Sequence, residues 1–158
     1  MNTEVSRHSS LRTFLFPTML LFSVLGALNA GYLSFTALSG VAPICNFVHG
    51  CDLVAASPYS RIFGVPLALF GVFFYSIIAG FSLWGWVSAQ APVRIYLRTL
   101  TALGFILSLY FLYLQWVVIE AFCEYCLFSL FDASVLFILS FFVMPTKHDI
   151  LEPLPDNT

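Results

Sequence analysis

The stretch "FGVPLALFGVFFYSIIAGFSLWGWV", residues 63–87, contains no charged side chain. A helix needs about 20 predominantly apolar residues to cross the hydrocarbon core of a bilayer, so this stretch predicts a membrane-spanning helix. Three further windows have the same character, at residues 14–38, 97–119 and 122–143. The sequence therefore predicts an all-α membrane protein. We expect a four-transmembrane-helix bundle that forms a single integral membrane domain over residues 1–158.

The composition agrees with this prediction. Of the 158 residues, 60% are hydrophobic, 18% are aromatic and only 9% are charged, far from the averages of soluble domains. The first window is too long for the apolar core of a signal peptide and lacks a small-residue cleavage site followed by a soluble domain, so we interpret it as a retained helix. The four windows leave no room for a soluble catalytic domain.

The few basic residues predict the orientation of the bundle. Positive charge accumulates on the cytoplasmic side of membrane proteins. In a four-span zigzag only Arg61 falls on one side, and the others fall on the opposite side: Arg7, Arg12, Arg94, Arg98 and Lys147. We therefore expect both termini to be cytoplasmic. The loop of residues 39–62 then lies outside the cytoplasm.

The boundary between the third and fourth windows is the least marked. The segment "QWVVIEAFCEYCLF", residues 115–128, contains neither glycine nor proline. An unbroken helix over residues 97–143 would be roughly 70 Å long at 1.5 Å per residue, more than twice the hydrocarbon thickness. We therefore predict a tight reversal near Glu120.

The four cysteines form two pairs. Cys45 and Cys51 lie in "ICNFVHGCD", residues 44–52, and Cys123 and Cys126 lie in "FCEYCLF", residues 122–128. Both pairs fall on the predicted non-cytoplasmic side, where disulfides form and persist. A cysteine at a helix N-terminus has a lowered pKa because the unpaired N–H groups favour a thiolate. The neighbouring glutamates oppose this, so the sequence leaves the sign of the net shift open.

Three roles are open for the cysteines. A disulfide closing the small ring between Cys45 and Cys51 would contribute only roughly 2 kcal/mol as a staple, whereas an exposed, labile bond suits thiol–disulfide exchange. All four cysteines could instead be structural. They could also bind a soft metal, with His49 as a further ligand, in a membrane transporter or metal-binding protein. Against a transporter, no cysteine pair on the cytoplasmic side and no acidic or histidine pathway through the spans would receive the ion.

Electrons leaving a redox-active pair need an acceptor. The sequence has no haem-ligand pattern, no nucleotide-binding glycines and no soluble domain, which favours a lipid-soluble acceptor such as a quinone. We expect it to bind between helices at the non-cytoplasmic end, beside the CxxC motif.

The order of these motifs resembles the vitamin K epoxide reductase family. The similarity covers residues 14–143 and rests on "CNFVHGC", on "DLVAASPYSRIFGVPLALFGVFFYS" and on a CxxC that opens the last helix. It points to the bacterial disulfide-forming branch, without a fused thioredoxin domain. The DsbB family performs the same overall chemistry, but it places its CxxC in the first external loop, the reverse of the order here.

The resemblance implies a role for each cysteine. Cys126 would reduce the quinone, which is ubiquinone, menaquinone or a vitamin K-type quinone, with Cys123 as its partner thiol. Cys45 would shuttle electrons to Cys123, and Cys51 would receive them from a thioredoxin-fold protein similar to DsbA. Ser57 would hydrogen-bond the quinone head group, although a turn or helix-cap serine before Pro58 has the same pattern. The implied location is the bacterial inner membrane, with the active site on the periplasmic side.

Several other polar residues have two interpretations each. Asp132 in the fourth span is expected to make an interhelical hydrogen bond, with proton relay as the alternative. Arg61 could stabilise a thiolate or anchor a helix end, and His49 could tune the loop cysteines or be solvated. Asn29 is expected to bridge helices. Relatives carry asparagine in the segment "GxPN" where this sequence has Leu67, so one hydrogen bond to the quinone would be missing.

Overall fold

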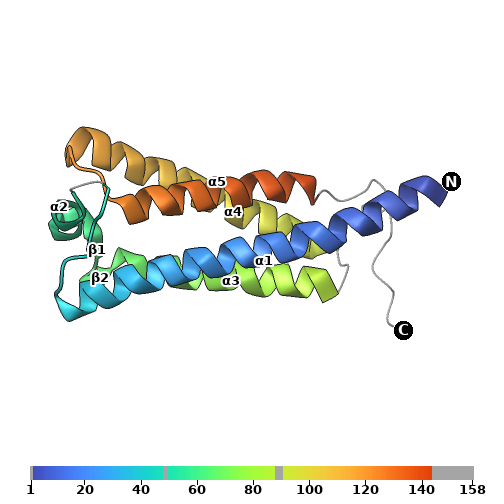
Figure 1. Cartoon of the computed structure of the whole chain (residues 1–158), viewed down its shortest axis with the longest axis horizontal. Helices are drawn as coiled ribbons and strands as arrows, with labels where there is room; N and C mark the ends of the chain where they lie inside the picture. The colour runs from blue at the N-terminus through green and yellow to red at the C-terminus, as the bar shows by residue number, and fades with distance from the viewer. Residues whose placement is uncertain (1, 48–49, 88–90, 144–158) are drawn as a thin grey trace.

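Four long helices run side by side along the length of the molecule (Figure 1). The computed structural model describes residues 2–47, 50–87 and 91–143. The long helices are α1 (Asn2–Ser39), α3 (Leu67–Val87), α4 (Ala91–Tyr113) and α5 (Glu124–Phe142). Helix α1 packs against α3 and α5, and α4 packs against the same two helices, so the four close into a bundle.

All four predicted spans are present. The segments long and apolar enough to cross a membrane are Phe14–Ser39, Leu67–Val87, Val93–Val118 and Glu124–Phe142. Helix α1 begins before its apolar span, at Asn2, because residues 2–13 contain no glycine or proline to end it. The second span begins at Leu67 rather than at residue 63, because the residues before it form a hairpin.

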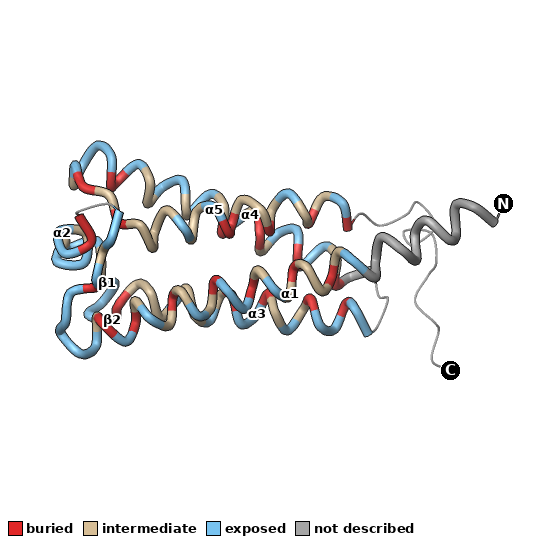
Figure 2. The backbone as a smooth tube through the Cα atoms, viewed as in Figure 1, coloured by how far each residue is buried: buried red, intermediate tan, exposed pale blue. Residues whose placement is uncertain are grey.

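The outer surface of the bundle is apolar. Large hydrophobic side chains project outward from every long helix, among them Leu28, Phe73, Ile106 and Phe131. The buried positions instead face the helix neighbours (Figure 2), where Met19, Ile78, Leu97 and Leu136 form part of one core. An apolar exterior of this extent suits contact with lipid rather than water.

One end of the bundle is covered by the connection between α1 and α3 (Figure 1). It contains helix α2 (Cys51–Ala56), the 3₁₀ turn η1 (Pro58–Ser60) and the strands β1 (Arg61–Ile62) and β2 (Val65–Pro66). The strands pair antiparallel through Phe63 and Gly64, whose φ angles are 52° and 81°. Two consecutive positive φ angles are those of the tight turn that matches strand twist.

The predicted reversal near Glu120 is confirmed. Helix α4 continues into a short π-helix, η2 (Leu114–Val118), in which the Ile119 N–H donates to the carbonyl of Leu114, five residues earlier, at 2.8 Å. Glu120 then adopts a left-handed conformation with φ 54°, and α5 begins four residues later. The reversal brings the CxxC motif to the same end of the bundle as α2.

Candidate thiol site

The two cysteine pairs are in different redox states. Cys45 and Cys51 form a disulfide with their Cα atoms 6.1 Å apart, whereas Cys123 and Cys126 are free thiols. Cys51 is the first residue of α2, and Cys123 is the N-cap residue of α5. The site thus holds one oxidised and one reduced pair at the same end of the bundle.

The loop pair, Cys45 and Cys51, lies directly on the segment that leads into the inner pair, Cys123 and Cys126. A Cβ atom added to Gly50 would be 2.7 Å from the carbonyl oxygen of Phe122. Only glycine allows the backbone before Cys51 to approach the backbone before Cys123 this closely. The solvent exposure of Cys51 and of Cys123 is 2%, while Cys45 is half-buried.

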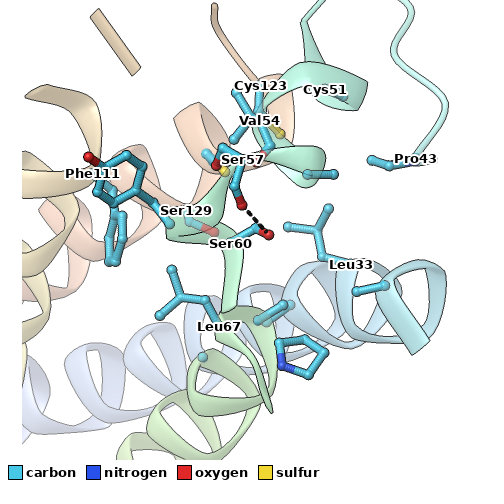
Figure 3. Close-up of a pocket in the computed structure, with 18 of the residues that line it drawn as sticks. Leu33, Pro43, Cys51, Val54, Ser57, Ser60, Leu67, Phe111, Cys123 and Ser129 are labelled. Carbon is cyan, nitrogen blue, oxygen red and sulfur yellow. Dashed lines mark hydrogen bonds between the residues drawn. The ribbon is translucent and has the colours of Figure 1, made fainter. Parts of the chain in front are cut away.

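A cavity of about 630 Å³ lies between the long helices and is lined on one side by α2. Figure 3 shows Cys51, Ser57 and Cys123 around it, with Leu67 and Phe111 on its apolar walls. Of the four cysteines, all of them in the described part of the chain, three line this cavity and Cys45 does not. Cys45 lies instead at a second hollow, of about 370 Å³, together with Cys51.

Ser57 is a turn serine that also lines the cavity. It precedes the turn η1, and its hydroxyl donates to the carbonyl of Val54 at 2.8 Å. It also lines the same cavity as Cys123 and Cys126. A hydroxyl that donates within its own turn keeps its oxygen lone pairs available as acceptors.

Gln115 is a site residue that the sequence analysis missed. Its side chain is 3% exposed, and its amide oxygen accepts a hydrogen bond from the backbone N–H of Cys123 at 2.8 Å. This bond satisfies one of the unpaired N–H groups at the start of α5. The available signal was an amide inside an otherwise apolar span, since buried polar groups in membranes usually have a partner.

The surroundings of Cys123 lower the pKa of its thiol. The side chain of Cys126 hydrogen-bonds the Cys123 sulfur and lowers the pKa of Cys123 to about 7, outweighing the opposing effect of burial. Hydrogen bonds from adjacent backbone groups add to the lowering, and the charge of Glu124 opposes it. The sequence left open the direction in which the pKa of this cysteine shifts, and the net shift is downward. A lowered pKa favours the thiolate, the form of a cysteine that undergoes exchange.

The residues between the two inner cysteines contact the loop pair. The carboxylate of Glu124 accepts the backbone N–H groups of Asn46 and Phe47, at 3.2 and 3.0 Å. The hydroxyl of Tyr125 donates to the carbonyl of Ile44 at 2.8 Å. The backbone on both sides of Cys45 is thus bonded to the first turn of α5.

The helix-bridging role predicted for Asn29 is confirmed, and Arg61 agrees with one of its two interpretations. The amide of Asn29 in α1 donates to the Tyr125 carbonyl and the Ser129 hydroxyl of α5, at 3.1 and 2.9 Å, so it bridges helices. Arg61 donates to the Ala37 carbonyl near the end of α1 at 3.1 Å, as expected of a helix-end anchor.

The predicted interhelical contact of Asp132 is present, with Tyr75 of α3 as its neighbour, but it does not have the geometry of a hydrogen bond. Asp132 is fully buried, and neither carboxyl oxygen has a hydrogen-bond partner among the described residues. The nearby Tyr75 hydroxyl donates instead to the carbonyl of Ser129, at 3.2 Å. The prediction for His49 lies outside the described residues.

A metal centre is not favoured. Within the described ranges, no group of three or more histidine, cysteine or acidic residues is arranged to hold a metal ion. Two of the four thiols are also joined in the loop disulfide, whereas a zinc-type thiolate site needs deprotonated cysteines.

Comparison with known families identifies a match that covers most of the chain. The family model for the vitamin K epoxide reductase family matches residues 17–141, which include both cysteine pairs and all but the outermost residues of the first and last spans.

Proposed function

Because this chain belongs to the vitamin K epoxide reductase family and is a membrane thiol oxidoreductase, we propose that it generates disulfides in proteins outside the cytoplasm. Electrons pass from a DsbA-like thioredoxin-fold partner through the two cysteine pairs to a membrane quinone. The observation that carries this proposal is the meeting of a disulfide and a dithiol at one cavity.

The cavity supports a quinone as the acceptor. Its volume of about 630 Å³ is in the range of small-molecule sites, and its walls are largely apolar, with a few polar groups such as Ser57 and Ser129. A quinone, when bound, supplies an acceptor for two electrons and two protons. Ser57 is the candidate hydrogen-bonding residue, and Leu67 contributes apolar contact.

The electron path consists of two exchanges and one oxidation. A thiolate of the partner attacks the loop disulfide, and the partner leaves oxidised while Cys45 and Cys51 become thiols. A loop thiolate then attacks Cys123 of the oxidised inner pair, and Cys126 leaves as a thiolate. The second loop thiol resolves this mixed disulfide, so two electrons and two protons have moved inward. The inner dithiol is finally oxidised to a disulfide, and Cys126 delivers the electrons at the cavity.

Burial supports an order of the loop cysteines opposite to that implied by the family resemblance. The resemblance assigns the contact with Cys123 to Cys45 and the contact with the partner to Cys51. Cys51, however, is 2% exposed and lines the cavity with Cys123, whereas Cys45 is more exposed. Exchange requires an accessible sulfur, so we propose that the partner attacks Cys45 and that Cys51 reaches Cys123.

The proposed location is a bacterial inner membrane, with both termini cytoplasmic and the thiol site periplasmic. The distribution of basic residues supports this orientation. Arg98, on the proposed cytoplasmic half of α4, stacks on the Phe141 ring at 4.4 Å, away from the thiol site. An oxidising compartment is also where a loop disulfide persists.

The test is reduction of a short-chain quinone by the purified protein in detergent or nanodiscs, driven by dithiothreitol or by a reduced DsbA-type protein. We expect both reductants to support turnover in the native protein. Cys126→Ala should abolish both activities. Cys51→Ala should abolish only the activity driven by the protein reductant, because dithiothreitol reaches the inner pair directly. Absence of quinone reduction by the native protein with either reductant would overturn the proposal.

A further inference from the structure

The hydrogen bonds between the CxxC motif and the loop flank one loop cysteine on both sides. Glu124 accepts the N–H groups of Asn46 and Phe47, the two residues that follow Cys45. Tyr125 donates to the carbonyl of Ile44, the residue that precedes it. Tyr32 of α1 accepts the N–H of Ile44 at 3.3 Å, and its ring contacts that of Tyr125, with centroids 5.0 Å apart.

These contacts are poorly placed to stabilise the fold. They lie at the exposed end of the bundle, where a hydrogen bond replaces one made with water and contributes little. Their effect is local, because they restrict the segment of residues 44–47, which belongs to no helix or strand. The disulfide ring is therefore held at two points, by these hydrogen bonds to α5 beside Cys45 and by the close approach of Gly50 to Phe122, which precedes α5.

We propose that Glu124 and Tyr125 are positioning residues, which hold the cysteine loop over the inner pair during exchange between the pairs. This inference rests on the proposed function. Exchange needs the attacking sulfur in line with the disulfide that it breaks, and a tethered loop meets this condition far more often than a free one. The attachment acts through the backbone, so it serves either loop cysteine.

The chemistry of the step is unchanged by this role. A loop thiolate forms a bond to the Cys123 sulfur, the Cys123–Cys126 bond breaks, and Cys126 carries away the electron pair as a thiolate. The second loop thiol then attacks the sulfur of the loop cysteine that is bonded to Cys123. This step restores the loop disulfide found in the structure and leaves Cys123 reduced. Glu124 and Tyr125 neither gain nor lose electrons.

The first experiment compares Glu124→Ala and Tyr125→Phe with the native protein, using the reduced DsbA-type protein and dithiothreitol as alternative reductants. We expect quinone reduction driven by the protein to fall by roughly tenfold in either variant, the size of effect that one or two hydrogen bonds support. Reduction driven by dithiothreitol should stay within about twofold, because it bypasses the loop. Glu124→Gln keeps one acceptor oxygen and should lie between Glu124→Ala and the native protein.

Matched controls come from the end of α4 and from the reversal that follows it. Glu120→Gln and Tyr113→Phe change the same side-chain types at exposed positions without a hydrogen bond to the loop among the described residues. They should leave both activities unchanged. A loss of the dithiothreitol activity in step with the protein-driven activity, or no loss in either, would overturn the proposal. A native protein inactive with both reductants would instead reject the function on which it rests.

The second experiment separates loop positioning from partner docking. In a Cys45→Ala, Cys126→Ala protein only Cys51 and Cys123 remain, and the rate at which they form a disulfide under mild oxidation involves no partner. Adding Glu124→Ala should slow this reaction by roughly tenfold. An unchanged rate, with the partner-driven activity still reduced, would show that Glu124 acts on the partner and would overturn the proposal.

Discussion

Gly50 lies so close to Phe122 that a Cβ atom on the glycine would be 2.7 Å from the phenylalanine carbonyl oxygen. A second close approach, 3.1 Å to the Ala121 Cβ atom, comes from the same segment. The connection between α1 and α3 therefore rests on the chain just before Cys123, without a side chain between them.

Gly50→Ala should displace the loop from the inner pair. Because the nearest atoms belong to backbone, they cannot rotate away, and we expect a loss of about 1–3 kcal/mol in the free energy of unfolding. Quinone reduction driven by a thioredoxin-fold protein should fall, and that driven by dithiothreitol should persist. Gly31→Ala, where nothing lies within 4 Å of the added Cβ, is the matched control. Equal behaviour of the two variants would contradict the importance of this contact.

A mixed disulfide between the pairs should be trappable. A Cys45→Ala, Cys126→Ala protein should form a bond between Cys51 and Cys123, and its Cys51→Ala, Cys126→Ala counterpart should form the Cys45 bond more slowly. Cleavage at a protease site inserted near Ala91, between α3 and α4, divides the chain into two fragments. Either bond holds the fragments together, so they separate on a gel only after reduction. Faster formation in the counterpart would restore Cys45 as the cysteine that reaches Cys123.

Thiolate formation at Cys123 should depend on pH. With Cys45 and Cys51 replaced by serine, alkylation of reduced Cys123 by iodoacetamide should accelerate as the pH rises and level off above its pKa of about 7. Cys126→Ala removes the hydrogen bond that lowers this pKa, so the midpoint should move to higher pH. Cys126→Ser retains a donor and should shift it less. A midpoint that is the same in both variants as in the protein with Cys126 would rule out this hydrogen bond as the cause of the lowered pKa.

Asp132→Leu should stabilise the protein. The carboxyl group is fully buried without a hydrogen-bond partner in the described residues, and leucine has the same branched shape. Removing an unsatisfied buried polar group should raise the free energy of unfolding by about 1–3 kcal/mol. Thermal unfolding in detergent provides the measurement, with Asp132→Asn as the variant that keeps a polar group. A lower melting temperature for the leucine variant would indicate an essential partner for the carboxylate.

Orientation can be read from labelling. After mild reduction of intact spheroplasts, a membrane-impermeant maleimide should modify Cys45 readily and the buried Cys51 slowly. Cys45→Ser provides the control for the assignment. Labelling of Cys45 only after the membrane is broken would reverse the proposed topology.

The spans were predictable because bilayer crossing depends on length and apolarity alone, properties that a single chain displays directly. The reversal near Glu120 followed from the same length argument. The hydrogen bonds of Glu124 to the loop were not predictable, because they join side chain to backbone across segments that are distant in the chain. The geometry at Asp132 was not predictable either, because the hydroxyl of the neighbouring Tyr75 had another acceptor available.

The π-helix at Leu114–Val118 sets which residue at the end of α4 faces the thiol site. Such a turn holds one residue more than an α-helical turn, and it places Gln115 where it meets the Cys123 N–H. Loss of a single residue there would restore regular helix and rotate the amide by about 100°. Among related sequences, one-residue gaps at this point should therefore accompany a different residue type at the position of Gln115, a signature that an alignment of homologues can reveal.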